Sequence, residues 1–277
     1  MSKIWFITGA SSGFGKELSR AVMDSGDKVA ASFRKTELAE EFSASNKDKA
    51  LGIVLDVTKP EQVKEAVQKV IKGFGKIDVL VNNAGYGTIG AIEEFSMEEV
   101  RQQMETNFFG AMAVTKEVLP LMREQRSGHI VQISSQAGFR AAAGFGLYNA
   151  SKFALEGFSE ALAQEVSSFG IRVVLVEPGP FRTKFLGSSM KTAKKRIPVY
   201  EDTGVGQMYQ YMERMNGKQE GDPVKAARAI VEYVHQNSPH LRLPLGKLSV
   251  QGIRAKLASV EKDLAANEAI AVSTVFE

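Results

Sequence analysis

The chain of 277 residues contains no cysteine and only three histidines. The absence of cysteine excludes disulfide bonds and cysteine-bound metals, and it is expected of a protein from a reducing compartment such as the cytoplasm. The histidines, at positions 129, 235 and 240, lack the spacing of metal ligands. The sequence therefore predicts no metal site and a cytoplasmic location.

Long apolar runs and an excess of one charge are also missing. No stretch approaches the roughly 18 consecutive apolar residues of a membrane span, and the N-terminus enters an apolar strand without a signal-peptide pattern. The net charge is only +3 and no basic block dominates, so neither a membrane nor a nucleic acid is an expected partner. With 44% hydrophobic and 24% charged residues, the composition is typical of a globular protein, and we expect one domain over 1–277.

Short apolar runs alternate with helical patterns along the chain. The expected strands are 3–8, 28–33, 50–55, 78–81, 129–134 and 171–177, and the expected helices are 16–23, 36–45, 60–74, 97–123 with a bend at Pro120, and 145–169. This alternation predicts an α/β fold, a Rossmann-like doubly wound parallel sheet with helices on both faces. In such sheets the ligand binds at the carboxyl ends of the strands.

The C-terminal part continues the pattern less regularly. We expect a helix at 223–236, a short strand at 241–243 and a helix at 248–264. The mildly apolar tail at 270–276 is expected to pack either on a neighbouring subunit or on its own domain.

A glycine-rich turn joins the first strand to the first helix. It reads Thr8-Gly-Ala-Ser-Ser-Gly-Phe-Gly15. Free backbone N–H groups at a helix N-terminus attract phosphate, and glycines remove the side chains that would block a pyrophosphate. We therefore expect a dinucleotide here, although a flexible turn would also need glycine. The turn residues expected to contact it are Gly9, Ser11, Ser12, Gly13, Phe14 and Gly15.

A second group of residues carries acid–base chemistry. Tyr148 and Lys152 are four residues apart in a predicted helix and therefore share one face. A lysine ammonium beside a phenol lowers the phenol pKa, which makes Tyr148 a proton donor or acceptor near neutral pH. Ser135 ends the preceding strand and is expected to orient a carbonyl oxygen toward the phenol, with Ser134 as the alternative.

The end of the second strand indicates which dinucleotide is bound. NAD sites usually carry an acidic residue there, but this chain reads Ser32-Phe33-Arg34-Lys35. Because Arg34 and Lys35 can pair with a 2′-phosphate and no carboxylate repels it, we expect NADP(H) rather than NAD(H). An ordinary solvated Arg-Lys pair is the alternative.

Taken in order, these motifs resemble those of the short-chain dehydrogenase/reductase family. The resemblance covers about residues 3–185 and adds Asp56-Val-Thr, Asn82-Asn-Ala-Gly85, Asn107, Pro178-Gly179 and Thr183. It implies an NAD(P)-dependent oxidoreductase that interconverts a carbonyl and an alcohol. In the family a basic residue often precedes the second glycine, and Ser12 stands there, which leaves use of NAD(H) open.

The resemblance also implies roles for individual residues. Lys152 would bind the nicotinamide ribose together with Tyr148, and Asn107 would hold a water that connects Lys152 to solvent, unless it only satisfies a nearby backbone group. Asp56 would bind the adenine, unless it is an ordinary surface residue, and the Asn-Ala-Gly segment could be a plain turn. The further cofactor contacts implied are Asp56, Val57, Asn83, Ala84, Gly85, Pro178, Gly179, Phe181 and Thr183.

The substrate is expected to be a medium-sized apolar ketone or aldehyde, as in hydroxysteroid or general carbonyl reductases. In the family, the region at about 184–222 is a mobile lid over the substrate; a small helix packed as core is the alternative. Phe139, Phe145 and Phe181 are expected near the pocket with Ser135 and Tyr148. Alternative functions are 3-oxoacyl-thioester reduction, a non-catalytic NADP(H) sensor, and a sugar-nucleotide epimerase or dehydratase.

By residue range, we expect about 1–185 to bind the dinucleotide and carry the reaction and about 223–277 to form C-terminal helices and a tail. By the same resemblance, the helices at about 97–123 and 145–169 would associate in a homodimer or homotetramer.

Overall fold

The architecture was determined from a computed structural model that describes residues 2–45 and 48–276. Its centre is a seven-stranded sheet in the order β3-β2-β1-β4-β6-β7-β9, in which all neighbouring strands are parallel. The strands are β1 Ile4–Ile7, β2 Lys28–Phe33, β3 Ala50–Val54, β4 Val79–Asn82, β6 Gly128–Ile133, β7 Ile171–Pro178 and β9 Arg242–Leu245. The order in which strands are added to the sheet changes sides at β1: β2 pairs with one edge of β1, and β4 pairs with the other. A ligand site is expected at the carboxyl end of such a reversal.

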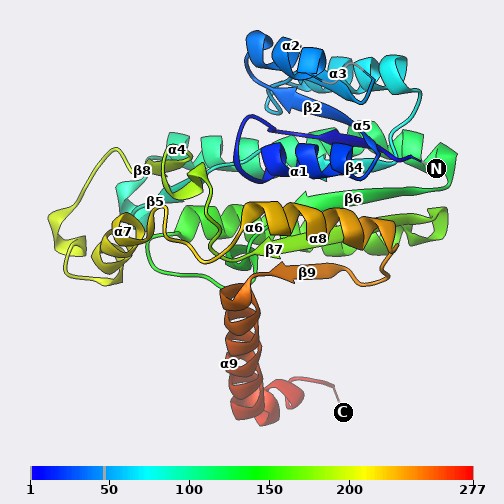
Figure 1. Ribbon diagram of the computed structural model, residues 1–277. Helices are drawn as coiled ribbons and strands as arrows, with labels where there is room; N and C mark the ends of the chain where they lie inside the picture. The colour runs from blue at the N-terminus through cyan, green and yellow to red at the C-terminus, as the bar shows by residue number, and fades with distance from the viewer. Residues whose placement is uncertain (1, 46–47, 277) are drawn as a thin grey trace.

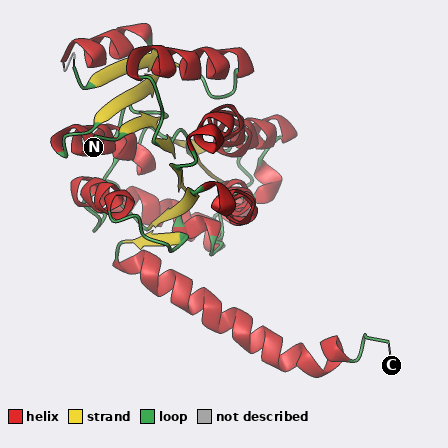
Figure 2. Ribbon diagram, turned by 90° about the vertical axis from the view of Figure 1, so that its right-hand side faces the viewer, coloured by secondary structure: helices red, strands yellow, loops and turns green. Residues whose placement is uncertain are grey.

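Helices cover both faces of this sheet, as Figures 1 and 2 show. The helices are α1 Gly13–Asp24, α2 Thr36–Ser45, α3 Pro60–Phe74, α4 Met97–Met104, α5 Gly110–Gln125, α6 Gly146–Val166, α7 Gly204–Met215, α8 Pro223–His235 and α9 Lys247–Val272. On one face α1, α2 and α8 pack on Trp5 and Ile7, and on the other α3, α5 and α6 pack on Ile4 and Phe6. Because alternate residues of β1 point to opposite faces, its whole apolar run is buried, as expected for a central parallel strand.

The predicted Rossmann-like α/β fold is confirmed, and several element boundaries agree closely. Helices α2 and α3 and strand β2 have the predicted bounds. The predicted helix at 97–123 is instead α4 and α5 joined by a π-helical segment, Glu105–Phe109, and Pro120 lies inside α5. The predicted tail at 270–276 was also wrong in part, because α9 runs on to Val272.

A second, small sheet ties the segment after β7 to the core. Strand β5 (Gly87–Ile89) pairs in parallel with β8 (Met190–Thr192), and α7 follows on the same side of the molecule (Figure 1). The expected irregular segment 184–222 therefore contains a strand and a helix, and α7 buries Val205 and Met212. Among residues 2–45 and 48–276, no helix is long and apolar enough to cross a membrane.

Candidate active site

Hydrogen bonds of the Asn83 amide and of the Thr8 hydroxyl hold the turn after β1. The Asn83 Nδ2 group donates hydrogen bonds to the carbonyl oxygens of Thr8 and Gly9, each at 2.9 Å. The Thr8 hydroxyl oxygen in turn accepts from the backbone N–H groups of Asn83 and Ala84, each at 3.0 Å. The loop after β4 is thereby fixed against the turn after β1, and the cofactor contacts predicted for Asn83 and Ala84 remain predictions.

Glycine is required in this turn for steric reasons. Gly9 has φ +71°, and a Cβ there would lie 2.9 Å from the Cα of Ala84. Gly13, at φ +57°, begins α1 opposite Thr183, to which a Cβ would come within 3.6 Å. A Cβ at Gly15 would lie 2.5 Å from both the Asn83 amide and the Gly9 carbonyl. A side-chain-free turn at a helix N-terminus fits the pyrophosphate of a dinucleotide.

The other predicted contacts of this turn lie around it. Ser11 is exposed and Ser12 is half-buried, whereas Phe14 packs its ring 5.0 Å from that of Phe181. The ring of Phe181 is buried and would collide with a Cβ at Gly221. Phe181 thus anchors the segment that follows β7, and the cofactor role predicted for it remains a prediction.

The ends of β2 and β3 lie next to each other at the same sheet edge, because β2 pairs with β3 from Val29 to Phe33. Phe33 is buried with its ring 5.3 Å from that of Phe42, whereas Arg34 and Lys35 are exposed. Asp56 follows β3, and its carboxylate accepts hydrogen bonds from the N–H and the hydroxyl of Thr58. The basic pair is therefore exposed at the carboxyl end of β2, at the same sheet edge as the glycine turn.

Three further predicted residues flank the site. Val57 is buried under a helix, since a Cβ at Gly110 would lie 2.6 Å from its side chain. Gly85 is exposed beside the Asn107 amide, and Gly179 donates its N–H to the carbonyl of Leu245 at 2.9 Å.

The carboxyl end of β6 and the first turns of α6 bring together Ser135, Tyr148 and Lys152, which we call the corner. Ser135 caps a short 3-10 turn, Gln136–Gly138: its hydroxyl accepts from the Ala137 N–H at 3.1 Å and donates to the Pro178 carbonyl at 3.4 Å, and it faces the phenol of Tyr148. Tyr148 and Lys152 are 7% and 6% exposed, and the ammonium lies 6.0 Å from the centre of the phenol ring. By contrast, the Ser134 hydroxyl is buried without a partner. The geometry favours Ser135 over Ser134 as the residue that faces the phenol.

Burial shifts the pKa values of both titratable groups in the corner, Tyr148 and Lys152. Desolvation raises the pKa of Tyr148 to about 12, and the hydrogen bond with Ser135 opposes the shift. Desolvation lowers the pKa of Lys152 to about 8, opposed by the charge of Glu156. The expected lowering of the Tyr148 pKa is therefore wrong for this structure, because the Lys152 ammonium donates to the Ile133 carbonyl at 2.7 Å and burial dominates at the phenol.

Asn107 lies in the π-helical segment between α4 and α5, and it is buried. Its amide nitrogen donates to the Tyr86 carbonyl at 2.9 Å and to the Ser151 hydroxyl at 3.1 Å, and its oxygen accepts from the Tyr86 N–H. Ser151 immediately precedes Lys152 on α6. Asn107 thus connects the loop after β4 to the helix that carries Tyr148 and Lys152, which is the backbone-satisfying role left open by the sequence. Single turns of π-helix are frequent at functional sites.

A charged network behind Lys152 was not foreseen. Glu156 lies one turn along α6 from Lys152, and the Arg242 guanidinium binds the carboxylates of Glu156, Glu160 and Glu177. Burial raises the pKa of Glu177, with a further contribution from the charge of Glu156. No motif links these residues, because they meet only after β9 has joined the sheet beside β7.

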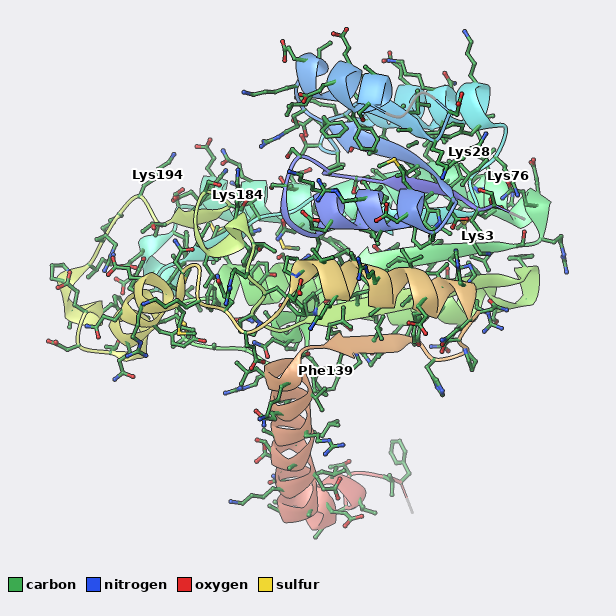
Figure 3. All side chains as sticks on the ribbon, in the orientation of Figure 1. Lys3, Lys28, Lys76, Phe139, Lys184 and Lys194 are labelled. Carbon is green, nitrogen blue, oxygen red and sulfur yellow. The ribbon has the colours of Figure 1, made fainter. Side chains whose placement is uncertain are left out.

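The predicted phenylalanines lie at different distances from the phenol. The Phe145 ring is 6.2 Å from that of Tyr148. Phe139 instead lies with its ring 5.1 Å from the Arg242 guanidinium, close to where α9 leaves the body (Figure 3). Phe185 was missed, although its ring lies 5.4 Å from that of Tyr148. Its only signal in the sequence was its place in the segment after β7.

Comparison with known proteins agrees with this geometry. The family model described as short chain dehydrogenase matches residues 3–194. The chain is 40% identical over 252 residues to Oxidoreductase BOA17 of Botryotinia fuckeliana, covering 91% of each chain. It is 40% identical over 259 residues to the 3-ketodihydrosphingosine reductase of Bacteroides thetaiotaomicron, covering 93% of this chain and 92% of the relative. A crystal structure of a short-chain dehydrogenase from Streptomyces avermitilis has a TM-score of 0.92 at 40% identity, with complete coverage of both chains.

Proposed function

The chain belongs to the short-chain dehydrogenase/reductase family and is an NAD(P)-dependent oxidoreductase, and on this basis we propose that it reduces a medium-sized apolar ketone or aldehyde with NADP(H). The observation that carries the proposal is the buried corner of Ser135, Tyr148 and Lys152, which lies at the same sheet edge as the glycine turn. In the proposed division, about 1–185 bind the dinucleotide and carry the reaction, and about 184–222 cover the substrate.

In this proposal Tyr148 is the proton donor. Its raised pKa keeps the phenol protonated at neutral pH, as an acid must be before it gives up its proton. Ser135, whose hydroxyl faces the phenol, holds the carbonyl oxygen next to it. When bound, the dinucleotide supplies a hydride to the carbonyl carbon, so that one hydride and one proton together convert the carbonyl to an alcohol.

Lys152 has two tasks in this proposal. Its buried ammonium stabilises the phenolate that Tyr148 becomes after proton transfer, since an opposite charge at short range favours the ionised form. It also binds the nicotinamide ribose. Glu156 stabilises the ammonium from the next turn of α6. Asn107 and Ser151 position this part of the helix.

The apolar character of the substrate is supported by the side chains around the phenol. The rings of Phe145 and Phe185 both lie near Tyr148, and Phe185 and the Met190 thioether converge on Gly87, where a Cβ would lie within 2.8 Å of each. The similarity to a reductase named for a ketone substrate, 3-ketodihydrosphingosine, supports the carbonyl reaction. Aromatic and thioether groups suit an apolar ketone rather than a sugar.

The preference for NADP(H) rests on the end of β2. Phe33 is buried against Phe42 and has no polar atom for a ribose hydroxyl, while Arg34 and Lys35 project into solvent beside it. A guanidinium at this position binds a 2′-phosphate, and the missing carboxylate removes the repulsion that would exclude it.

The test is NADPH consumption with a panel of carbonyl compounds. The panel contains alkyl ketones, aldehydes, quinones, steroid ketones and an acetoacetyl thioester, each assayed with the wild type, Tyr148→Phe and Tyr233→Phe. Tyr233 is a matched control because its hydroxyl donates to the His240 carbonyl, away from the corner. We expect turnover that Tyr148→Phe loses and Tyr233→Phe keeps. Tight NADPH binding without turnover of any carbonyl would instead favour a dinucleotide sensor.

A further inference from the structure

Helix α9 stands away from the rest of the molecule. It leaves the body after β9 and projects beyond it in both ribbon views (Figures 1 and 2). Only Ser249 and Gly252 of this helix are buried, and every residue from Leu257 to Phe276 is exposed. A helix of 26 residues spans about 39 Å. Helices in proteins depend mainly on packing of an apolar face, so a partner surface would stabilise the exposed part of α9.

The apolar residues of α9 recur with the spacing of a coiled-coil seam. They alternate three and four residues apart, as in positions a and d of a heptad repeat. Leu257 and Leu264 are 54% and 58% exposed, and Val260 between them is 47% exposed. We call the a and d positions the α9 seam: they carry the apolar residues Val250, Ile253, Leu257, Val260, Leu264 and Ala271 and one polar residue, Asn267.

Charged residues flank the α9 seam on both sides, in heptad positions e and g. One side carries Lys247, Arg254, Glu261 and Glu268, and the other carries Lys256 and Asp263. On each side the positive charges come first and the negative charges follow. A helix with this order is complementary to an antiparallel copy of itself.

One antiparallel register pairs these charges throughout. When Leu257 packs against Val260 of a second copy, Arg254 faces the second Glu261 and Lys256 faces the second Asp263. In the same register Lys247 faces the second Glu268. Because a two-fold axis relates the two helices, each of these pairs occurs twice.

Other arrangements bring like charges together. Sliding the antiparallel helices by one heptad in one direction places Glu261 opposite Glu261 and Asp263 opposite Asp263, and sliding in the other places Arg254 opposite Arg254 and Lys256 opposite Lys256. A parallel pair mixes the two kinds of contact, because position g faces position e of the next heptad: Lys256 lies beside Glu261, but Asp263 lies beside Glu268. Like charges at such positions select against the pairing.

We propose that α9 forms an antiparallel two-helix coiled coil with α9 of a second copy of this chain, in the register that places Leu257 against Val260. The two bodies then lie at opposite ends of the pair. The segment of α7 and β8 lies on a different side of the body from α9 (Figure 1), so the pairing leaves that segment uncovered. This interface is distinct from the association through the helices near 97–123 and 145–169 that the family resemblance implies.

The charge pattern gives a direct test by analytical ultracentrifugation of the full-length protein. In Arg254→Glu/Lys256→Glu and in Glu261→Lys/Asp263→Lys, each chain repels its own copy, so the mass of the wild-type assembly is expected to fall by half in each variant. An equimolar mixture of the two variants restores every pair and is expected to regain the wild-type mass. The control is Lys262→Glu, which changes a charge on the face of α9 opposite the α9 seam.

The orientation is tested with introduced cysteines, since the chain has none of its own. In the proposed register an oxidised mixture of Leu257→Cys and Val260→Cys forms an intermolecular disulfide, whereas each variant alone does not. A parallel pair would crosslink each variant with itself.

Besides self-crosslinking of each cysteine variant, three results would overturn the proposal. They are a wild type that is monomeric, an assembly whose mass the charge variants leave unchanged, and a monomer that instead binds phosphatidylcholine vesicles through α9. NADPH-dependent turnover of each variant serves as the check of folding, because none of these residues touches the active site.

Discussion

The glycine turn after β1 and the corner formed by Ser135, Tyr148 and Lys152 lie at one sheet edge but differ in construction. The turn presents backbone groups, and its shape depends on the absence of side chains at its glycines, with φ +71° at Gly9 and φ +57° at Gly13. The corner offers buried side chains, and its properties come from desolvation, which shifts the pKa values of Tyr148 and Lys152 in opposite directions.

This difference assigns separate tasks to the two regions. A backbone cradle fixes where a dinucleotide binds and has no group that titrates in the working range. The corner has titratable groups and therefore controls proton transfer. Changes in the turn should act on dinucleotide affinity, and changes in the corner should act on turnover.

The largest effect is expected for Tyr148→Phe. Removal of the phenol hydroxyl deletes the proton donor while the ring still fills its site between Phe145 and Phe185. We expect kcat for carbonyl reduction to fall by about 1,000-fold, within the range for loss of general acid catalysis. NADPH affinity, measured by fluorescence titration, should change by less than about threefold. A variant that still turns over at the wild-type rate would remove Tyr148 from the mechanism.

The next largest effect is expected for Gly9→Ala. The added Cβ meets the Ala84 backbone at 2.9 Å, and the positive φ adds strain of about 1–3 kcal/mol. We expect the NADPH dissociation constant to rise by about 10- to 100-fold.

Gly26→Ala is the matched control for this change. Gly26 also has a positive φ, +91°, but a Cβ there meets nothing within 4 Å. The same loss of affinity in both variants would show that general destabilisation, and not the shape of the turn, is responsible.

A smaller effect is expected for Arg34→Ala on the choice of dinucleotide. Loss of one charge-assisted hydrogen-bonding group, worth about 1.5–3 kcal/mol, should lower the ratio of kcat/KM for NADPH to that for NADH by about 30-fold. Arg20→Ala is the control, because its side chain is 61% exposed on α1. An unchanged ratio would show that Arg34 is an ordinary solvated surface residue.

The smallest effect concerns pH. Lys152 titrates at about 8, whereas Tyr148, at about 12, remains protonated well above that pH. The charge that stabilises the phenolate is therefore present below pH 8 and lost above it, so kcat/KM for NADPH, which reports free-enzyme groups, should fall about tenfold between pH 7 and pH 9. Lys152→Arg keeps its charge and should move this fall to higher pH. A flat profile in the wild type would contradict the assignment.

The same separation explains what could be predicted from the sequence. The positions of Gly9, Asn83 and Ser135 were predictable because each follows a buried strand, and parallel strands bring their carboxyl ends to one edge. Tyr148 was predictable from its spacing to Lys152 on one helix. The alternation of strands and helices fixed this order without knowledge of packing.

The wrong and missed predictions arise from side-chain packing and burial. The pKa of Tyr148 depends on burial and on where the Lys152 ammonium donates its hydrogen bonds, which no spacing reveals. Phe139 lies by Arg242 because β9 joins the sheet beside β7, and Phe185 reaches Tyr148 through the segment after β7. The extent of α9 was underestimated because its apolar spacing becomes sparse after Leu264.

The most direct test of the two-region account is the double variant Gly9→Ala/Tyr148→Phe, measured beside both single variants. If the turn binds and the corner reacts, the double variant shows the NADPH dissociation constant of Gly9→Ala and the kcat of Tyr148→Phe, because independent changes add in free energy. A dissociation constant or kcat that departs by more than about tenfold from these values would contradict the separation of binding from proton transfer.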